Sequence, residues 1–268
     1  MPDHRILDHN QAAAAAWNAG GMAYNDVSFA ISDALAHAAQ RLAPAAGERI
    51  LDVATGTGWS ARNVARPDAH VTAVDIAPDL LQAAHDLSRQ CAPPIDYRLA
   101  DAEDLPFSEG QFDKVISTFG VMFASDHARA ARELGRVCRK GGRLCLATWT
   151  PDGGVARFFA VLAPHSKAPP PAASPLLWGD PAYLQTLLGN DFALAFEPGV
   201  SNCYFDDVDA IWNWYLQGFG PMRALHDSLD DAGRRALKKD LDAYHNHYTV
   251  EAGLHVRREY LVTIGRRR

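Results

Sequence analysis

Short apolar segments alternate with helical segments between residues 48 and 150, and this alternation limits the chain to few folds. Strands that alternate with helices form a parallel sheet with helices on both faces. Right-handed crossovers bring the carboxyl ends of these strands to one edge of the sheet, where ligands bind. The five strands predicted in this part of the chain are RILDVA, VTAVDIA, DYRLADA, FDKVISTF and RLCLATW.

Two later segments extend the predicted sheet to seven strands. The segment FALAFEPGVSNCYF is expected to be a strand interrupted at Pro198–Gly199, and EYLVTIG is expected to be the last strand. A helical stretch lies between them in the sequence. We therefore predict an α/β fold with a Rossmann-like, mostly parallel sheet and a helical cap over its carboxyl edge.

The composition is that of an acidic protein without a metal motif. The 268 residues carry a net charge of −6, which does not favour binding to nucleic acid. The four cysteines form no C-x-x-C pair, so we expect no metal site. The start of the chain is polar and no apolar run reaches the length of a membrane span, so we expect a cytoplasmic protein.

The loop ILDVATGTGWSA joins the first predicted strand to a helix. Gly56-x-Gly58-x-x-Ala61 fits the dinucleotide pattern G-x-G-x-x-G/A, which indicates a nicotinamide cofactor. Asp52 fits a ligand with an ammonium group instead, such as the amino-acid end of S-adenosylmethionine, whose carboxylate the glycine N–H groups can face. Asp75, at the end of the second strand, can bind two ribose hydroxyls of either cofactor. The loop and Asp75 leave both cofactors open.

The segment LADAEDLPFSEGQFDKVIST, which follows the third predicted strand, distinguishes the two cofactors. Asp101 can accept a hydrogen bond from an adenine amino group, and the Ala102 N–H can donate to a ring nitrogen. A dinucleotide dehydrogenase does not need this arrangement.

The chain resembles the class I S-adenosylmethionine-dependent methyltransferases, in the broad group similar to the ubiquinone/menaquinone-biosynthesis C-methyltransferases. The resemblance spans about Ile50–Trp149 and rests on ILDVATGTG, VTAVDIAPDLL, DAEDLPFSEGQFD, ISTFGVMFASD and ELGRVCRKGGRLCLATW, in that order.

The resemblance implies a site for S-adenosylmethionine, with S-adenosylhomocysteine as the product. It implies that the first loop holds the methionine end, that Asp75 holds the ribose and that the segment at Asp101 holds the adenine. Tyr24 is expected to cover the cofactor, whereas Trp17 is expected to pack in the core. The cofactor-binding residues that the resemblance implies are Tyr24, Asp52, Ala54, Gly56, Gly58, Asp75, Ile76, Asp101, Ala102, Thr118 and Phe119.

The resemblance also organises the chain as a single methyltransferase domain. Residues 1–45 are expected to form an N-terminal helical cap, and residues 46–150 the cofactor-binding core. A proline-rich loop and a late strand are expected over 151–206, and a helical cap insertion over 207–250. The last strand and a basic tail are expected over 251–268.

Methyl transfer is an in-line displacement from a reactive sulfonium, so the protein mainly has to align the acceptor and exclude water. The helical segment Asp209–Met222 is rich in aromatic residues, which indicates a pocket for a small apolar or aromatic acceptor. No residue is a firm acid or base, and the candidates are His127, His245 and Tyr215. His245 belongs to the motif YHNHY, which we expect to be a solvated helix end.

Two alternative functions remain open from the sequence. A nicotinamide-dependent oxidoreductase rests on the glycine pattern and on Asp75. A non-catalytic S-adenosylmethionine-binding protein would keep the loop and use the cap as an interaction surface. The partner expected of the methyltransferase is a small-molecule acceptor rather than nucleic acid, and the protein is expected to be a monomer or a homodimer. Carbon, oxygen and nitrogen acceptors all occur on this fold, so the fold selects none of them.

Overall fold

The computed structural model describes residues 6–66, 68–91 and 93–268. An open sheet with the strand order β3-β2-β1-β4-β5-β8-β6 forms its centre, and the short β7 pairs with β8. Strands β1 to β5 are parallel, whereas β8 is antiparallel to β5 and β6. The predicted mostly parallel, seven-stranded sheet is therefore confirmed, with β7 as an addition. The strands are β1 Arg49–Val53, β2 His70–Asp75, β3 Asp96–Leu99, β4 Phe112–Thr118, β5 Cys138–Trp149, β6 Phe192–Phe205, β7 Thr249–Val250 and β8 Gly253–Arg267.

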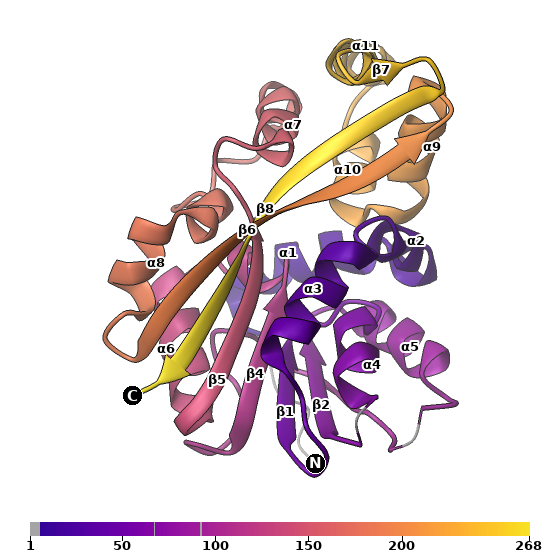
Figure 1. Cartoon of the computed structure of the whole chain (residues 1–268). Coiled ribbons are helices and arrows are strands. Elements are labelled where there is room, and N and C mark those ends of the chain that lie inside the picture. Colours follow the sequence, from indigo (N-terminus) through magenta and orange to yellow (C-terminus); the bar gives the residue numbers. More distant parts are fainter. Residues whose placement is uncertain (1–5, 67, 92) are drawn as a thin grey trace.

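Helices cover both faces of the sheet, with α3, α4 and α5 on one face and α6 and α8 on the other (Figure 1). The α-helices are α1 Gln11–Asn18, α2 Tyr24–Phe29, α3 Ser32–Leu42, α4 Trp59–Ala65, α5 Pro78–Leu87, α6 His127–Val137, α7 Gly154–Leu162, α8 Pro181–Leu188, α9 Val208–Gly218, α10 Gly220–Asp227 and α11 Asp231–Asn246. The short 3₁₀ helices are η1 Asp8–Asn10, η2 Gly21–Ala23, η3 Val121–Phe123, η4 Ala163–His165 and η5 Pro175–Gly179. Among the helices of the described ranges, none is both long and apolar enough to cross a membrane.

Local sequence signals explain where two of the helices begin. Helix α5 begins at Pro78, whose fixed φ suits the first helical position and whose missing N–H is not needed there. Helix α6 is capped by Asp126, whose carboxylate accepts a 2.9 Å hydrogen bond from the Arg129 N–H. Helices α5 and α6 therefore begin soon after β2 and β4 and carry the chain back along the sheet. The strands that follow them are parallel to β2 and β4 and end at the same edge of the sheet.

Strand β6 is continuous, so the predicted interruption at Pro198–Gly199 is wrong. In the antiparallel register Pro198 lies opposite Leu261 and Gly199 lies opposite Tyr260. A proline is tolerated here because β6 is the edge strand and one side of it needs no ladder hydrogen bond. Glycine is needed opposite Tyr260, because a Cβ atom at position 199 would lie 2.3 Å from the tyrosine ring.

Strands β6 and β8 continue past the sheet and carry the cap, as Figure 1 shows. Around the far half of this strand pair, α7, α9, α10 and α11 enclose an apolar cluster of their own, which we call the cap cluster. It consists of the buried residues Phe158, Cys203, Ile211, Tyr215, Met222, Leu237, Leu241, Leu254 and Val256. The larger core lies within the sheet and its covering helices.

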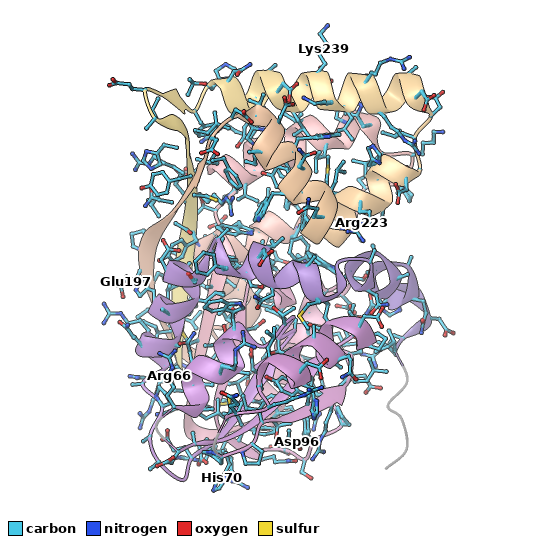
Figure 2. The ribbon with its side chains drawn as sticks, turned by 90° about the vertical axis from the view of Figure 1, so that its right-hand side faces the viewer. Arg66, His70, Asp96, Glu197, Arg223 and Lys239 are labelled. Carbon is cyan, nitrogen blue, oxygen red and sulfur yellow. The ribbon has the colours of Figure 1, made fainter. Side chains whose placement is uncertain are left out.

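The N-terminal helices lie between the cap and the sheet, where α1 packs on α10 and α2 packs on α9. The contact is close because Gly218 has no side chain: a Cβ atom there would lie 2.5 Å from the Ala23 carbonyl oxygen. Arg223 also joins the two parts, since its Nη1 donates a 2.8 Å hydrogen bond to the Ala19 carbonyl (Figure 2). Helices α1 and α2 thus roof the edge of the sheet, whereas α3, which was expected to belong to the N-terminal cap, covers a face of the sheet. Residues 1–5 of the predicted N-terminal cap lie outside the described residues.

We predict that truncation of the cap cluster destabilises the protein as a whole. Leu241 is 1% exposed, so Leu241→Ala removes buried methyl groups and should lower the free energy of unfolding by about 2–5 kcal/mol. Leu87→Ala is the matched control, because Leu87 is 39% exposed, and it should cost less than about 1 kcal/mol. Urea unfolding followed by circular dichroism measures both. A separate early transition for Leu241→Ala alone would contradict the single-domain organisation.

Candidate functional site

A cavity of about 910 Å³ opens at the carboxyl edge of the sheet, beneath the N-terminal helices. Its wall is formed by the loops that follow β1, β2, β3 and β4 and by residues from the roof. Nine of the residues expected to bind a cofactor line this cavity: Tyr24, Ala54, Gly56, Asp75, Ile76, Asp101, Ala102, Thr118 and Phe119. Parallel strands thus bring together Ala54 and Phe119, which are 65 positions apart in the sequence.

The conformation of the loop after β1 leaves room for an aromatic ring above it. Ala54 and Gly56 both have a φ of 56°, in the left-handed region. A Cβ atom at Gly56 would lie 3.2 Å from Cε1 of Tyr24, so glycine gives the tyrosine ring room over the loop. Burial and the neighbouring Asp75 raise the pKa of Tyr24, which therefore remains a neutral phenol at pH 7.

The glycine N–H groups are used within the loop, which differs from the prediction that they face a ligand carboxylate. The Gly56 N–H donates a 2.8 Å hydrogen bond to Asp75 Oδ2, and the Gly58 N–H donates a 3.0 Å bond to the Thr55 carbonyl. Neither group is directed at a ligand in this arrangement. The loop is instead shaped by its own hydrogen bonds, with Asp75 as the tie between β1 and β2.

Asp52 and Gly58 are not among the residues that line the first cavity, so their expected contact with the ligand stays a prediction. Asp52 is fully buried, and its Oδ2 accepts a 2.6 Å hydrogen bond from Thr55 Oγ1. Its Oδ1 has no hydrogen-bond partner among the described residues. A Cβ atom at Gly58 would meet Tyr97, on the far side of the loop. Both residues support the loop from behind.

Asp75 is 6% exposed and lines the cavity at the end of β2. Besides the bond from Gly56, its Oδ1 accepts a 2.9 Å hydrogen bond from the Ala77 N–H. Burial raises the pKa of this carboxyl group, and the N–H groups of Gly56, Ala77 and Ile76 oppose the rise because they favour the ionised form. A carboxylate has about four acceptor positions, so these N–H groups do not occupy all of them.

Asp101 fastens the N-terminal segment onto the cavity. Its Oδ2 accepts hydrogen bonds from the Leu7 N–H at 3.2 Å and from Asn10 Nδ2 at 2.9 Å. The neighbouring Glu103 adds a 2.7 Å contact with His9 Nε2. Asn10 lines the cavity and was missed by the sequence reasoning, because nothing in the motif LDHN indicates that it pairs with a residue more than ninety positions away.

A second cavity of about 660 Å³ adjoins the first one, between the sheet edge and the cap. We call the residues common to both cavities the shared wall: Trp17, Tyr24, Ile31, Phe119 and Phe123. Trp17 was expected to pack in the core, but it lines both cavities. Its ring lies 5.1 Å from the ring of Phe123 and 5.7 Å from that of Phe219, measured between centroids, so it joins the shared wall to the cap.

Phe119 follows β4 and belongs to the shared wall, and its backbone conformation is strained. Its φ of 56° is uncommon for a residue with a bulky side chain. The ring stacks on Trp149, with centroids 3.9 Å apart, and this packing compensates for the backbone conformation. Next to it, the hydroxyl oxygens of Thr118 and Ser60 lie 2.7 Å apart. The end of β4 thus presents a fixed aromatic face between the cavities.

His127 follows β4, which makes it a candidate base near the strand ends, but it is not among the residues that line either cavity. It is the first residue of α6, and its Nδ1 lies 2.9 Å from the Tyr183 hydroxyl. The side chain packs between α6 and α8, because its ring also contacts that of Trp178. Burial lowers the pKa of this imidazole.

His245 is buried in the cap cluster, so the expectation of a solvated helix end is wrong for it. Its Nδ1 donates a 2.8 Å hydrogen bond to the Leu241 carbonyl, which leaves Nε2 to accept from the Tyr215 hydroxyl at 3.4 Å. Burial lowers the pKa of His245 to about 4, so the imidazole is neutral at pH 7. Two of the three acid–base candidates therefore meet in the cap, and Tyr215 lines the second cavity.

Aromatic side chains make up most of the second cavity's wall. Helical spacing in Asp209–Met222 predicts Trp212, Tyr215 and Phe219 on one face and Trp214 on the other. Tyr215, Phe219 and Trp214 all line the cavity. Trp212 does not line it, but is half-buried against the cap cluster beside His226. Within the described ranges, no group of three potential metal ligands occurs.

Comparison with known proteins identifies the family. A model of the methyltransferase domain matches residues 51–146. An uncharacterized protein of Mycobacterium tuberculosis is 36% identical over 200 residues, which cover 72% of each chain. The demethylmenaquinone methyltransferase of Tropheryma whipplei is 33% identical over 199 residues, which cover 72% of this chain and 78% of that enzyme.

Solved structures show the same fold. The YcgJ protein from Bacillus subtilis has a TM-score of 0.62 at 17% identity and matches 88% of this chain and 99% of its own. A geranyl diphosphate methyltransferase in complex with S-adenosylmethionine has a TM-score of 0.52 at 16% identity, over 88% of this chain and 85% of that one. The fold and the cavity at the strand ends define a class I methyltransferase architecture.

The chain belongs to the S-adenosylmethionine-dependent methyltransferases of class I. It is accordingly an enzyme that binds S-adenosylmethionine and uses it for methylation. This assignment sets aside both the nicotinamide-dependent oxidoreductase and the non-catalytic binding protein.

We predict that Asp52 makes the protein less stable as the pH rises. Burial raises its pKa to about 7, whereas an unfolded Asp titrates near 4, so the folded state holds the proton more tightly. The stability contributed by this proton is complete below pH 4 and is lost as the pH rises through 7. Asp52→Asn should therefore gain roughly 3 kcal/mol of unfolding free energy relative to wild type between pH 5 and pH 8.

Urea unfolding at pH 5 and pH 8 measures this difference. Asp152→Asn is the control, because Asp152 is exposed in the turn before α7, and its difference from wild type should not change with pH. Parallel pH profiles for Asp52→Asn and wild type would contradict the prediction.

Proposed function

We propose that the protein transfers a methyl group from S-adenosylmethionine in the first cavity to a small apolar or aromatic molecule in the second. The adjacency of the two cavities across the shared wall carries this proposal. Direct displacement requires the donor and acceptor atoms to lie about 3–3.5 Å apart. Two cavities that have Tyr24 and Phe119 in common support such an approach, with S-adenosylhomocysteine as the product.

The contacts described above support a division of roles in the first cavity. We propose that Asp75 binds the ribose hydroxyls, for which it retains acceptor positions. Asp101 and Ala102 would bind the adenine edge, and Ile76 its face. Tyr24, which lies over Gly56, would cover the methionine end. The sulfonium supplies an activated methyl group, so the chain itself needs to bind, orient and exclude water.

The second cavity supports catalysis by alignment rather than by a strong base. Its wall holds eleven aromatic residues and no Asp or Glu: Trp17, Tyr24, Phe119, Phe123, Trp149, Phe158, Phe159, Trp214, Tyr215, Phe219 and Tyr244 are the aromatic ones. Aromatic faces fix an apolar acceptor and keep water away from the reacting atoms. The Tyr215 hydroxyl, bonded to the neutral His245, is a polar group in this wall and would orient an acceptor.

Loss of the Asp75 carboxylate should weaken cofactor binding. Asp75→Ala is expected to reduce affinity for S-adenosylhomocysteine by about 1–3 kcal/mol, the range for hydrogen bonds to a charged group. Isothermal titration calorimetry measures this affinity. Asp86→Ala on the exposed side of α5 is the control and should bind as wild type does. Unchanged binding by Asp75→Ala would exclude the proposed role.

Filling the second cavity should separate methyl transfer from cofactor binding. Val155 of α7 lines the second cavity but not the first, so Val155→Phe places a ring where the acceptor is proposed to bind. We expect methyl transfer to a panel of aromatic and quinone-like acceptors to fall at least about tenfold, because alignment is lost. Affinity for S-adenosylhomocysteine should stay within about twofold of wild type, less than 0.5 kcal/mol.

Val200→Phe is the control, because Val200 lies on β6 and is 36% exposed. It should leave both activities unchanged. Undiminished transfer by Val155→Phe would contradict the location of the acceptor. The absence of product from every acceptor, in wild-type protein that binds S-adenosylhomocysteine, would contradict the acceptor class.

A further inference from the structure

We propose that the methyl acceptor is an amphipathic anion, whose carboxylate or phosphate group binds Arg258 while its apolar part fills the second cavity. This inference rests on the proposed function, because it takes the second cavity as the acceptor site. It adds a charge requirement that the aromatic wall alone does not indicate. Among the described residues that line the second cavity, Arg258 is the one cation.

Arg258 belongs to β8 and lies opposite Ser201 of β6. Its side chain is oriented inward, since the residue is only 7% exposed. The guanidinium carbon lies 5.5 Å from the centre of the Trp214 ring, another residue of the cavity wall. This cation–π contact holds the guanidinium beside the cavity without neutralising its charge.

No ion pair between Arg258 and a carboxylate is found in the described part of the chain. Its Nη2 is buried there without a hydrogen-bond partner. The guanidinium does interact with the thiol of Cys203, but burial raises the pKa of this thiol, so it carries no charge that would neutralise the arginine. Asp33 accepts a 2.6 Å hydrogen bond from Ser201 Oγ and a 2.8 Å bond from the Ala34 N–H. Its carboxylate is thus directed at these donors.

An unpaired buried cation is costly, and a ligand can remove the cost. Burial of a charge without a partner destabilises a folded protein, so buried charges are normally paired. Even the half-buried Arg267, also on β8, is paired, since its Nη1 lies 2.7 Å from Asp191 Oδ1. The planar guanidinium of Arg258 matches a carboxylate or phosphate, which it can bind through two parallel hydrogen bonds.

The position of Arg258 places the anionic group at the end of the acceptor that is remote from the reacting atom. Tyr260 lies two residues further along β8, and its ring is 6.0 Å from that of Phe119 in the shared wall. Two residues of a strand span about 7 Å, so Arg258 lies about that much further into the cap than Tyr260. An acceptor anchored at Arg258 therefore extends its apolar part past the aromatic wall toward the cofactor cavity.

Paired probes test the charge requirement. Calorimetry with the S-adenosylhomocysteine-loaded protein compares 2-naphthoate and 2-naphthyl phosphate with the neutral 2-naphthamide. We expect one of the two anions to bind at least about tenfold more tightly than the amide, as for hydrogen bonds to a charged group. A preference for naphthoate assigns a carboxylate, and a preference for the naphthyl ester assigns a phosphate.

Substitutions test whether Arg258 is the residue that binds the anionic group. Arg258→Met keeps much of the side-chain length and should remove the preference for the anion, roughly a 10- to 100-fold loss, with little change for the amide. Arg258→Lys should keep part of the preference, because it keeps the charge and loses the fork. Arg257→Met is the matched control, because the neighbouring Arg257 is exposed on the other face of β8, and it should bind as wild type does.

The outcomes separate this inference from the proposed function. Equal binding of anions and amide, no saturable binding of either anion, or an unchanged preference in Arg258→Met would overturn the role of Arg258 while S-adenosylhomocysteine still binds. Failure of wild type to bind S-adenosylhomocysteine would instead contradict the proposed function. If Arg258→Met does not fold, the wild-type comparison together with Arg258→Lys decides the question.

Discussion

The continuous pairing of β6 with β8 is the constraint on which the rest of the structure depends. The register runs without a break from Phe192 opposite Arg267 to Phe205 opposite Leu254. Its near half belongs to the sheet, where β8 also pairs with β5. Its far half carries the cap cluster. Because one strand pair supports both apolar clusters, the cap is held over the edge at which the parallel strands end.

The N-terminal segment completes the site by joining these two parts. It bonds to the cofactor cavity through Asp101, and it packs on the cap at Gly218, where only a glycine allows the close approach. Trp17 and Tyr24 thereby come to lie between the two cavities. Nearby N–H and hydroxyl groups donate hydrogen bonds to the buried carboxylates at the strand ends, and these bonds hold the carboxylates in place.

Sequence reasoning succeeded where a residue's position follows from the ends of strands. Parallel strands meet at one edge, so the arrival of Asp75, Asp101 and Thr118 at a common cavity followed from strand order alone. The surroundings of Asp52 did not follow in this way, because its carboxylate is fully buried next to a loop whose backbone is left-handed at Ala54. The conformation of this loop depends on packing beneath Tyr24, and the sequence gives no signal for that packing.

The sequence by itself determined the fold class, the family and nine of the residues that line the first cavity, because strand periodicity and the ordered motifs are local properties. Only the tertiary structure decided how the cap meets the sheet. The burial of His245, the position of Trp17 between two cavities and the unpaired charge of Arg258 all depend on contacts between distant segments. Such contacts leave no regular spacing in the chain, since they arise from the side chains that close packing brings together.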